Sequence, residues 1–219
     1  RWPTSGSLVA DEATADALRA GGVPPDLIHI LGFPVTMKFE TLVPAAAPQD
    51  GQWKALFFPG GTAQNAVGTL EQLAKVPHLE ITAVTGRRFK VHATMENAGL
   101  PRHGSLVGWT DEMPQLMASH QLFIGKAGGA TVQEAIAAQI PFLVNHVVPG
   151  QEEGNIAMIE QTGIGALVTG APRRIHDVVI GALANDAALW KTWRANLACL
   201  QKPSASRSIA RFLLDRCPR

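Results

Sequence analysis

Short runs of hydrophobic residues alternate along the chain with segments in which hydrophobic residues recur at helical spacing. The runs are continuous and mostly end at glycine, proline or asparagine, as strands buried on both faces of a sheet do. The segments between them place hydrophobic residues three and four positions apart, as helices do. This alternation predicts an α/β fold, a Rossmann-like parallel sheet with helices on both faces. The predicted strands are residues 27–31, 55–58, 79–84, 105–107, 122–124, 141–144 and 166–168.

Helical periodicity and turn residues predict the remaining organisation. Helices are expected within residues 63–74, 113–117, 130–138, 156–160 and 178–183, followed by two closing helices. Residues 43–52 contain two prolines and a glycine and are the best linker candidate. We therefore expect residues 1–42 to be the remnant of one domain and residues 53–219 to form a second. Because the chain begins with Arg1 rather than Met, we expect a fragment whose N-terminal part is missing.

Composition excludes several classes of protein. The 219 residues, 46% of them hydrophobic, can bury roughly 70% of their unfolded surface without metal or disulfide support. Nineteen basic and 18 acidic residues give a net charge of +1, so bulk charge does not indicate a nucleic-acid partner. Cys199 and Cys217 show no metal-ligand spacing and fit a reducing, cytoplasmic location. No apolar run approaches the ~18 residues of a transmembrane helix.

The first candidate site follows the predicted strand 55–58. Gly60, Gly61 and Thr62 come directly after that strand and open a helix. Glycines let backbone N–H groups approach a ligand, and a helix N-terminus carries partial positive charge, so this turn can bind an anion. The alternative for this motif is an ordinary turn between a strand and a helix.

The second candidate site repeats the pattern after residues 122–124. Gly128 and Gly129 precede a helix, and Lys126 adds a formal positive charge. Thr131 can cap the helix or bind a phosphate. Glu134, one turn into the helix, suits the vicinal hydroxyls of a ribose, although complementing the helix dipole is the alternative. The spacing matches neither the P-loop nor the dinucleotide fingerprint.

The third candidate site follows residues 141–144. Gln151, Glu152 and Asn155 offer many hydrogen-bond donors and acceptors at another helix start, which suits a polyhydroxylated ligand such as a sugar. Helix capping alone is the alternative. Because open α/β sheets bind ligands beyond the carboxyl ends of their strands, the three motifs together predict a nucleotide-sugar site.

A known family carries the same motifs. The strings K-x-G-G-x-T-x-x-E-A and P-G-Q-E-x-G-N lie between Gly125 and Gly165. This stretch resembles the C-terminal, donor-binding domain of family 28 glycosyltransferases, which are GT-B enzymes that use UDP-sugars. The likeness is greatest to processive diacylglycerol glucosyltransferases and monogalactosyldiacylglycerol synthases. A weaker likeness extends from about Ser7 to Val168.

The resemblance implies a role for each matching position. Glycines and threonines of the turns face the diphosphate, Glu134 binds the ribose, and Arg87 neutralises phosphate. The segment after residue 107 contacts uracil, although Trp109 suits a core or interface role equally well. Arg88 stands where many family members have Asn. The implied donor-binding residues are Gly60, Gly61, Thr62, Arg87, Trp109, Thr110, Met113, Lys126, Gly128, Gly129, Thr131, Glu134, Gln151, Glu152 and Asn155.

The reaction implied by the resemblance is inverting transfer of a hexosyl group from a UDP-sugar to a lipid such as diacylglycerol or a similar acceptor. No Asp-x-Asp motif occurs, so we expect no metal and no cofactor, and helix N-termini would stabilise the leaving diphosphate. The missing N-terminal domain is expected to supply the base, the acceptor site and peripheral contact with the inner face of the membrane. His29, His103 and His146 are accordingly expected to be structural.

Two other functions stay open at this point. The first is a non-catalytic module that binds a UDP-sugar and acts only with a partner or with the missing domain. The second is a UDP-sugar epimerase that shares the GT-B fold, but we find no matching pattern of catalytic carboxylates and histidine. The missing dinucleotide fingerprint disfavours an oxidoreductase.

Overall fold

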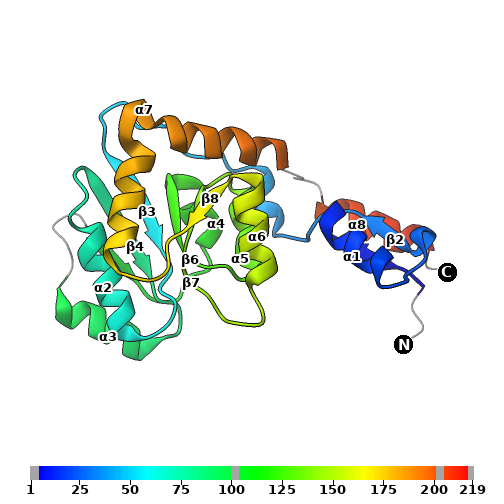
Figure 1. Cartoon of the computed structure of the whole chain (residues 1–219), viewed down its shortest axis with the longest axis horizontal. Coiled ribbons are helices and arrows are strands. Elements are labelled where there is room, and N and C mark those ends of the chain that lie inside the picture. The colour runs from blue at the N-terminus through cyan, green and yellow to red at the C-terminus, as the bar shows by residue number, and fades with distance from the viewer. Residues whose placement is uncertain (1–4, 100–103, 201–204, 217–219) are drawn as a thin grey trace. The chain divides into compact units, whose positions relative to one another are not determined.

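The computed structural model describes residues 5–99, 104–200 and 205–216, which form two compact units (Figure 1). Residues 1–41 and 202–219 make up the first unit, and Leu42–Gln201 make up the second. The last helix, α8 (Ala205–Arg216), therefore groups with the N-terminal residues rather than with the sheet domain to which the sequence analysis assigned it. The reason is local contact: Ser206 Oγ donates to the Val35 carbonyl at 2.6 Å, and the Phe212 ring lies 4.5 Å from His29.

The first unit is small. Strand β1 (Ser7–Val9) pairs in parallel with β2 (Ile28–Ile30), and helix α1 (Glu12–Ala20) connects them. Asp11 caps α1 by accepting the N–H of Thr14. The core of this unit is Val9, Ala15 and Ile28, and two short 3-10 turns lie at Pro25–Leu27 and Met37–Glu40.

The second unit is a six-stranded parallel sheet, as the sequence predicted. Its strand order is β5-β4-β3-β6-β7-β8, in which β3 and β6 are neighbours although two strands separate them in sequence. This is the Rossmann order, and its switch point between β3 and β6 is where open α/β sheets bind ligands. The strands are β3 (Trp53–Phe57), β4 (Leu79–Val84), β5 (Gly104–Val107), β6 (Leu122–Lys126), β7 (Phe142–His146) and β8 (Gly165–Leu167).

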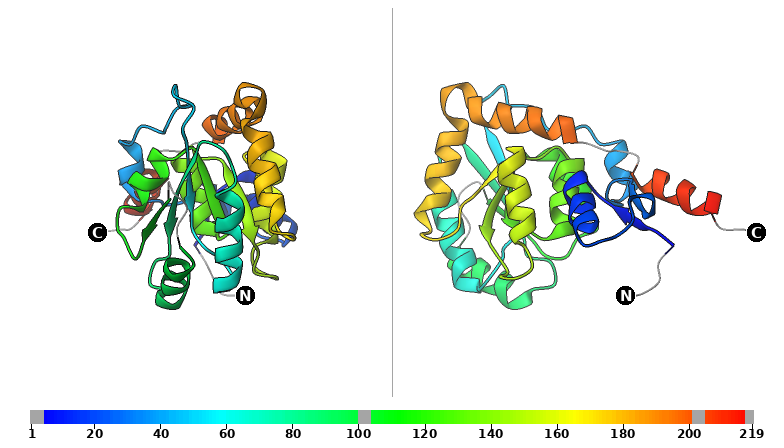
Figure 2. Two further views of the ribbon diagram at one scale, coloured as in Figure 1. Left: turned by 90° about the vertical axis from the view of Figure 1, so that its left-hand side faces the viewer. Right: turned by 45° about the vertical axis from the view of Figure 1, so that its right-hand side comes forward.

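Helices cover both faces of this sheet (Figures 1 and 2). One face packs against α2, α3 and α7 in a continuous apolar cluster that includes Phe57 and Ile81. Side chains alternate along a strand, so Leu56, Phe123 and Phe142 are fully buried on the other face. The helices are α2 (Ala63–Leu73), α3 (Phe89–Ala98), α4 (Met113–Ser119), α5 (Gly129–Ala137), α6 (Glu153–Thr162) and α7 (Arg173–Leu200).

Helix α7 breaks where the sequence predicted a boundary between two helices. The backbone leaves helical geometry from Ala184 to Ala187, and Asn185 and Asp186 have positive φ angles, which these two residue types tolerate. The second half buries Trp190, whose indole N–H donates to the Gln121 carbonyl at 2.8 Å. None of the helices in the described part of the chain is both long and apolar enough to cross a membrane.

Candidate functional site

All candidate residues except Glu134 lie in loops, strand ends or first helical turns at the carboxyl edge of the six-stranded sheet. The loops that follow β3 and β6 meet at the switch point, because these two strands are neighbours. The loops after β4 and β5 lie on one side of it and the loop after β7 lies on the other. The parallel arrangement therefore brings the three sequence motifs to one edge.

The turn from β3 to α2 is closely packed on one side. Thr62 is the N-cap of α2, and its hydroxyl accepts the N–H of Asn65 at 3.2 Å. Gly61 has a φ of +66°, a conformation that side chains rarely adopt. A Cβ on Gly60 would lie 2.7 Å from Cβ of His146, so only glycine fits there. His146 therefore packs against this turn.

The turn from β6 to α5 repeats this design. Gly128 is the N-cap of α5 and has no side chain to cap it, so the first N–H groups of the helix stay available to a ligand. The side chain of Asn155 reaches over from α6 and donates to the Ala127 carbonyl at 2.8 Å. Thr131 lies in the first turn of α5 and is half-buried. Two helix N-termini thus flank the switch point.

Lys126 and Glu152 form an ion pair beside this second turn. Lys126 Nζ lies 2.6 Å from Glu152 Oε1, and the Glu152 side chain is only 4% exposed. The second oxygen of Glu152 accepts the N–H of Val148 at 3.0 Å. Both oxygens of the Glu152 carboxylate are therefore hydrogen-bonded within the protein. Gln151, which precedes it in the loop between β7 and α6, is exposed.

Glu134 lies one turn into α5 and is half-buried. Burial raises the pKa of its carboxyl group. Within the described residues, no side-chain hydrogen bond or ion pair engages this carboxylate. A half-buried carboxylate without a protein partner is able to accept hydrogen bonds from a ligand.

The neighbouring arginines after β4 have different partners. The Arg87 guanidinium lies 5.2 Å from the ring centre of Trp109, which is 60% exposed, so a core role for Trp109 does not fit. Arg88 instead turns to the first glycine turn, where it donates to the Pro59 carbonyl at 2.5 Å and to the Gly61 carbonyl. From sequence, Arg88 stands out only as a departure from the family pattern.

The remaining candidate residues lie close to this edge without specialised contacts. Thr110 Oγ1 accepts the N–H of Glu112 at 3.1 Å, and Met113 is the half-buried first residue of α4. His29 belongs to the first unit, and His103 lies outside the described residues. No cluster of three or more potential ligands for a metal ion occurs within residues 5–99, 104–200 and 205–216.

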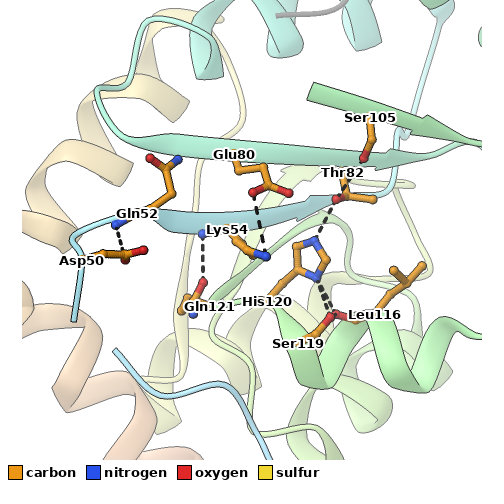
Figure 3. Close-up of polar contacts among 10 residues, drawn as sticks. All are labelled: Asp50, Gln52, Lys54, Glu80, Thr82, Ser105, Leu116, Ser119, His120 and Gln121. Atoms are coloured by element: carbon orange, nitrogen blue, oxygen red, sulfur yellow. Dashed lines mark hydrogen bonds and ion pairs between the residues drawn. The ribbon is translucent and has the colours of Figure 1, made fainter. Parts of the chain in front are cut away.

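A buried histidine packs against the middle of strand β4 (Figure 3). His120 Nε2 lies 2.9 Å from Thr82 Oγ1, Nδ1 lies 2.7 Å from the Leu116 carbonyl, and Ser105 donates to Thr82. The Leu116 carbonyl can only accept, so Nδ1 carries the proton and Nε2 accepts from Thr82. Burial lowers the pKa of His120. No sequence pattern pointed to this network, and none of its residues is among the candidate site residues.

Comparison with known proteins points to one family. Residues 56–160 match the glycosyltransferase family 28 C-terminal domain. The processive diacylglycerol β-glucosyltransferase of Staphylococcus saprophyticus is 25% identical, over 94% of this chain and 55% of that protein. The protein of that name from Staphylococcus epidermidis is 27% identical with the same coverage. The chain spans about half the length of the curated relatives that it matches.

Solved structures share the fold. The glycosyltransferase of kitacinnamycin has a TM-score of 0.67 at 16% identity, over 98% of this chain and 55% of that one. Anabaena HepE, solved in complex with UDP-glucose, has a TM-score of 0.58 at 16% identity, over 97% of this chain and 64% of that one. These likenesses confirm the predicted Rossmann-like α/β fold.

Proposed function

We propose that this chain is the donor-binding half of a UDP-sugar-dependent hexosyltransferase, because residues 56–160 match the glycosyltransferase family 28 C-terminal domain. The observation that carries the proposal is the pair of strand–glycine–helix turns on either side of the switch point. Within the described residues, each presents first-turn N–H groups without a protein acceptor, apart from the Asn65 N–H that Thr62 caps, and the positive end of a helix dipole. Together these features suit a diphosphate. The relatives are named for glucosyl transfer to diacylglycerol, which makes a lipid hydroxyl the proposed acceptor.

The proposed donor site extends from the diphosphate to both ends of the ligand. Glu134 accepts hydrogen bonds from the ribose hydroxyls, because within the described residues no protein group engages its carboxyl oxygens. Burial raises the pKa of this carboxyl group, and hydrogen bonds from the ribose hydroxyls would oppose that shift by stabilising the ionised form. Trp109, Thr110 and Met113 border the base. Gln151 and Asn155 face the sugar, and the Lys126–Glu152 pair holds the loop that carries them.

In the proposed reaction the acceptor oxygen attacks the anomeric carbon, and the bond from that carbon to the β-phosphate oxygen breaks with inversion. The leaving UDP takes the bonding electron pair, and the proton of the acceptor hydroxyl passes to a base that we place in the remainder of the enzyme. Negative charge therefore grows on the diphosphate, between the two helix N-termini. Preorganised N–H groups stabilise such charge without having to reorient. The same remainder would supply the acceptor site and any peripheral contact with the membrane.

Calorimetric titration of this chain with UDP tests the proposal. We expect binding by the wild type and about a tenfold or greater loss in Glu134→Ala, because a charged acceptor of two hydroxyl groups disappears. Glu71→Ala is the matched control, since Glu71 lies exposed on α2, beyond its first turn. A folded wild type that does not bind UDP would contradict the proposed donor site. A Glu134→Ala variant that binds UDP as tightly as the wild type would contradict the role of Glu134.

A non-catalytic UDP-sugar module is the second candidate function, because the chain covers only 55% of its curated relatives. Transfer of hexose from a UDP-sugar to diacylglycerol in vesicles separates the two functions. UDP binding without transfer by this chain, followed by transfer when the rest of the protein is added, assigns catalysis to the whole enzyme. UDP binding without transfer in both cases assigns a binding module.

A further inference from the structure

The Arg88 side chain links two loops at the carboxyl edge of the sheet. It starts in the loop after β4 and ends at the turn after β3, where its two terminal nitrogens donate to the carbonyls of Pro59 and Gly61. Arg88 is half-buried, and within the described residues no carboxylate pairs with it. Its donors are therefore directed at the backbone of a single turn.

These two contacts fix the direction of the amide groups that follow. In a planar trans peptide the C=O and N–H bonds point in opposite directions. A hydrogen bond to the Pro59 carbonyl thus orients the Gly60 N–H away from Arg88, and a hydrogen bond to the Gly61 carbonyl does the same for Thr62. In the described part of the chain, neither N–H donates to a protein acceptor.

The positive charge of Arg88 also strengthens these donors. A guanidinium on the carbonyl oxygen polarises the peptide group, so its N–H becomes a better hydrogen-bond donor on the far side. His146 packs against Gly60 and Gly61 at the same time, with Nδ1 3.1 Å from where a Cβ on Gly61 would lie. The turn is therefore fixed from two sides.

We infer that Arg88 is a positioning residue of the donor site, which orients the Gly60 and Thr62 amides toward the diphosphate without touching it. This inference rests on the proposed function for its ligand, but the orientation of the turn is a property of the chain alone. An asparagine, which has one amide group with two donors on a shorter side chain, lacks the planar fork that lets one arginine hold two carbonyls.

The binding test compares UDP with uridine for Arg88→Met, Arg88→Lys and the wild type. We expect both variants to lose about tenfold in UDP affinity and less than about twofold in uridine affinity, because only the phosphates meet the misplaced amides. Lysine keeps the charge but cannot bridge two carbonyls as a fork. Wild-type UDP affinity in Arg88→Lys, or an equal loss for UDP and uridine, overturns the inference.

A matched control comes from a second arginine that donates to a backbone carbonyl. Arg194 on α7 donates to the Gln139 carbonyl, in the loop before β7 at the opposite edge of the sheet. Arg194→Met should leave both affinities within about twofold of the wild type. A tenfold loss of UDP affinity in this control would show that removing any such arginine is enough, which contradicts a specific role for Arg88.

A second measurement does not depend on nucleotide binding. Backbone ¹⁵N relaxation should give order parameters near 0.85 for Gly60 and Gly61 in the wild type and in Arg194→Met, and below about 0.6 in Arg88→Met. A rigid turn in Arg88→Met overturns the inference. If the wild type does not bind UDP, the proposed function fails while a loosened turn still supports the positioning role.

Discussion

Lys126 and Glu152 pair across 26 positions of sequence, and their ion pair joins the end of β6 to the start of α6. The Lys126 side chain is 42% exposed, whereas the Glu152 side chain is 4% exposed and its carboxylate also accepts a backbone N–H. The buried carboxylate of Glu152 therefore depends on Lys126 for its charge partner, and the ion pair anchors a loop of the candidate site.

Removing the positive charge of Lys126 should lower the stability of the protein. Lys126→Met leaves Glu152 buried with a single hydrogen bond, so we expect the free energy of unfolding to fall by about 2 kcal/mol or more. Urea titration at pH 7 measures it. Lys54→Met is the matched control, since its 3.8 Å pair with Glu80 is exposed on both sides and should contribute less than about 1 kcal/mol. Equal effects of the two substitutions would contradict the expected difference.

The packing of His146 on the first glycine turn predicts a steric effect. Gly60→Ala places a Cβ 2.7 Å from Cβ of His146, and we expect a loss of about 1–3 kcal/mol in stability with weaker UDP binding. The double variant Gly60→Ala with His146→Gly, which removes the clashing Cβ, should recover part of both. Gly68→Ala has open space around it in helix α2 and should stabilise the protein by about 0.5–1 kcal/mol. A double variant no better than Gly60→Ala alone would contradict the steric explanation.

Glu134 should make stability depend on pH in a definite direction. Burial raises its folded-state pKa above the ordinary 4.5, so the folded protein holds this proton more tightly than the unfolded chain. The stabilisation is complete below pH 4.5 and is lost as the pH rises through the raised pKa. Glu134→Gln should therefore be more stable than the wild type at pH 7, and the difference should vanish near pH 4. Urea titrations at both pH values measure this, with Glu71→Gln unchanged as control.

His120 should act in the opposite direction. Burial lowers its pKa in the folded protein, so below about pH 6.5 the histidine is protonated in the unfolded chain while it stays neutral in the folded protein. Stability should fall as the pH is lowered from 7 toward the folded-state pKa, and His120→Gln should flatten this part of the curve. His78→Asn is the control, because His78 is exposed and Asn tolerates its φ of +56°. A slope that persists in His120→Gln would contradict the assignment to His120.

The sheet could be predicted because its strands are short apolar runs that end at turn residues. All six strands of the second unit overlap a predicted run. The elements that escaped prediction lack that signal: β1 has three residues, and α1 buries only Ala15. Helix α3 begins after Arg88 with no side-chain cap and has a weak apolar stripe, so neither its start nor its period was visible.

The candidate site could be predicted only as a set of loops. Turn glycines reveal themselves in sequence because they follow strands and precede helices. The interaction partner of a side chain is not visible in sequence, because it depends on residues that meet only after folding. Arg87 and Arg88 are adjacent, yet one lies over Trp109 and the other holds the glycine turn. In the same way Glu152 looked like a sugar ligand in sequence, while in the structure it is buried against Lys126.

The strand order also divides the sheet domain into two halves of continuous chain. Strands β3, β4 and β5 form one half, β6, β7 and β8 form the other, and β3 and β6 meet through three registered residue pairs from Ala55–Leu122 to Phe57–Ile124. Each half contributes one glycine turn to the switch point. A diphosphate that contacts both turns would therefore connect the two halves, and its binding free energy would add to the stability of the contact between β3 and β6. On the proposed function, a bound nucleotide would consequently also oppose separation of the two halves of the sheet domain.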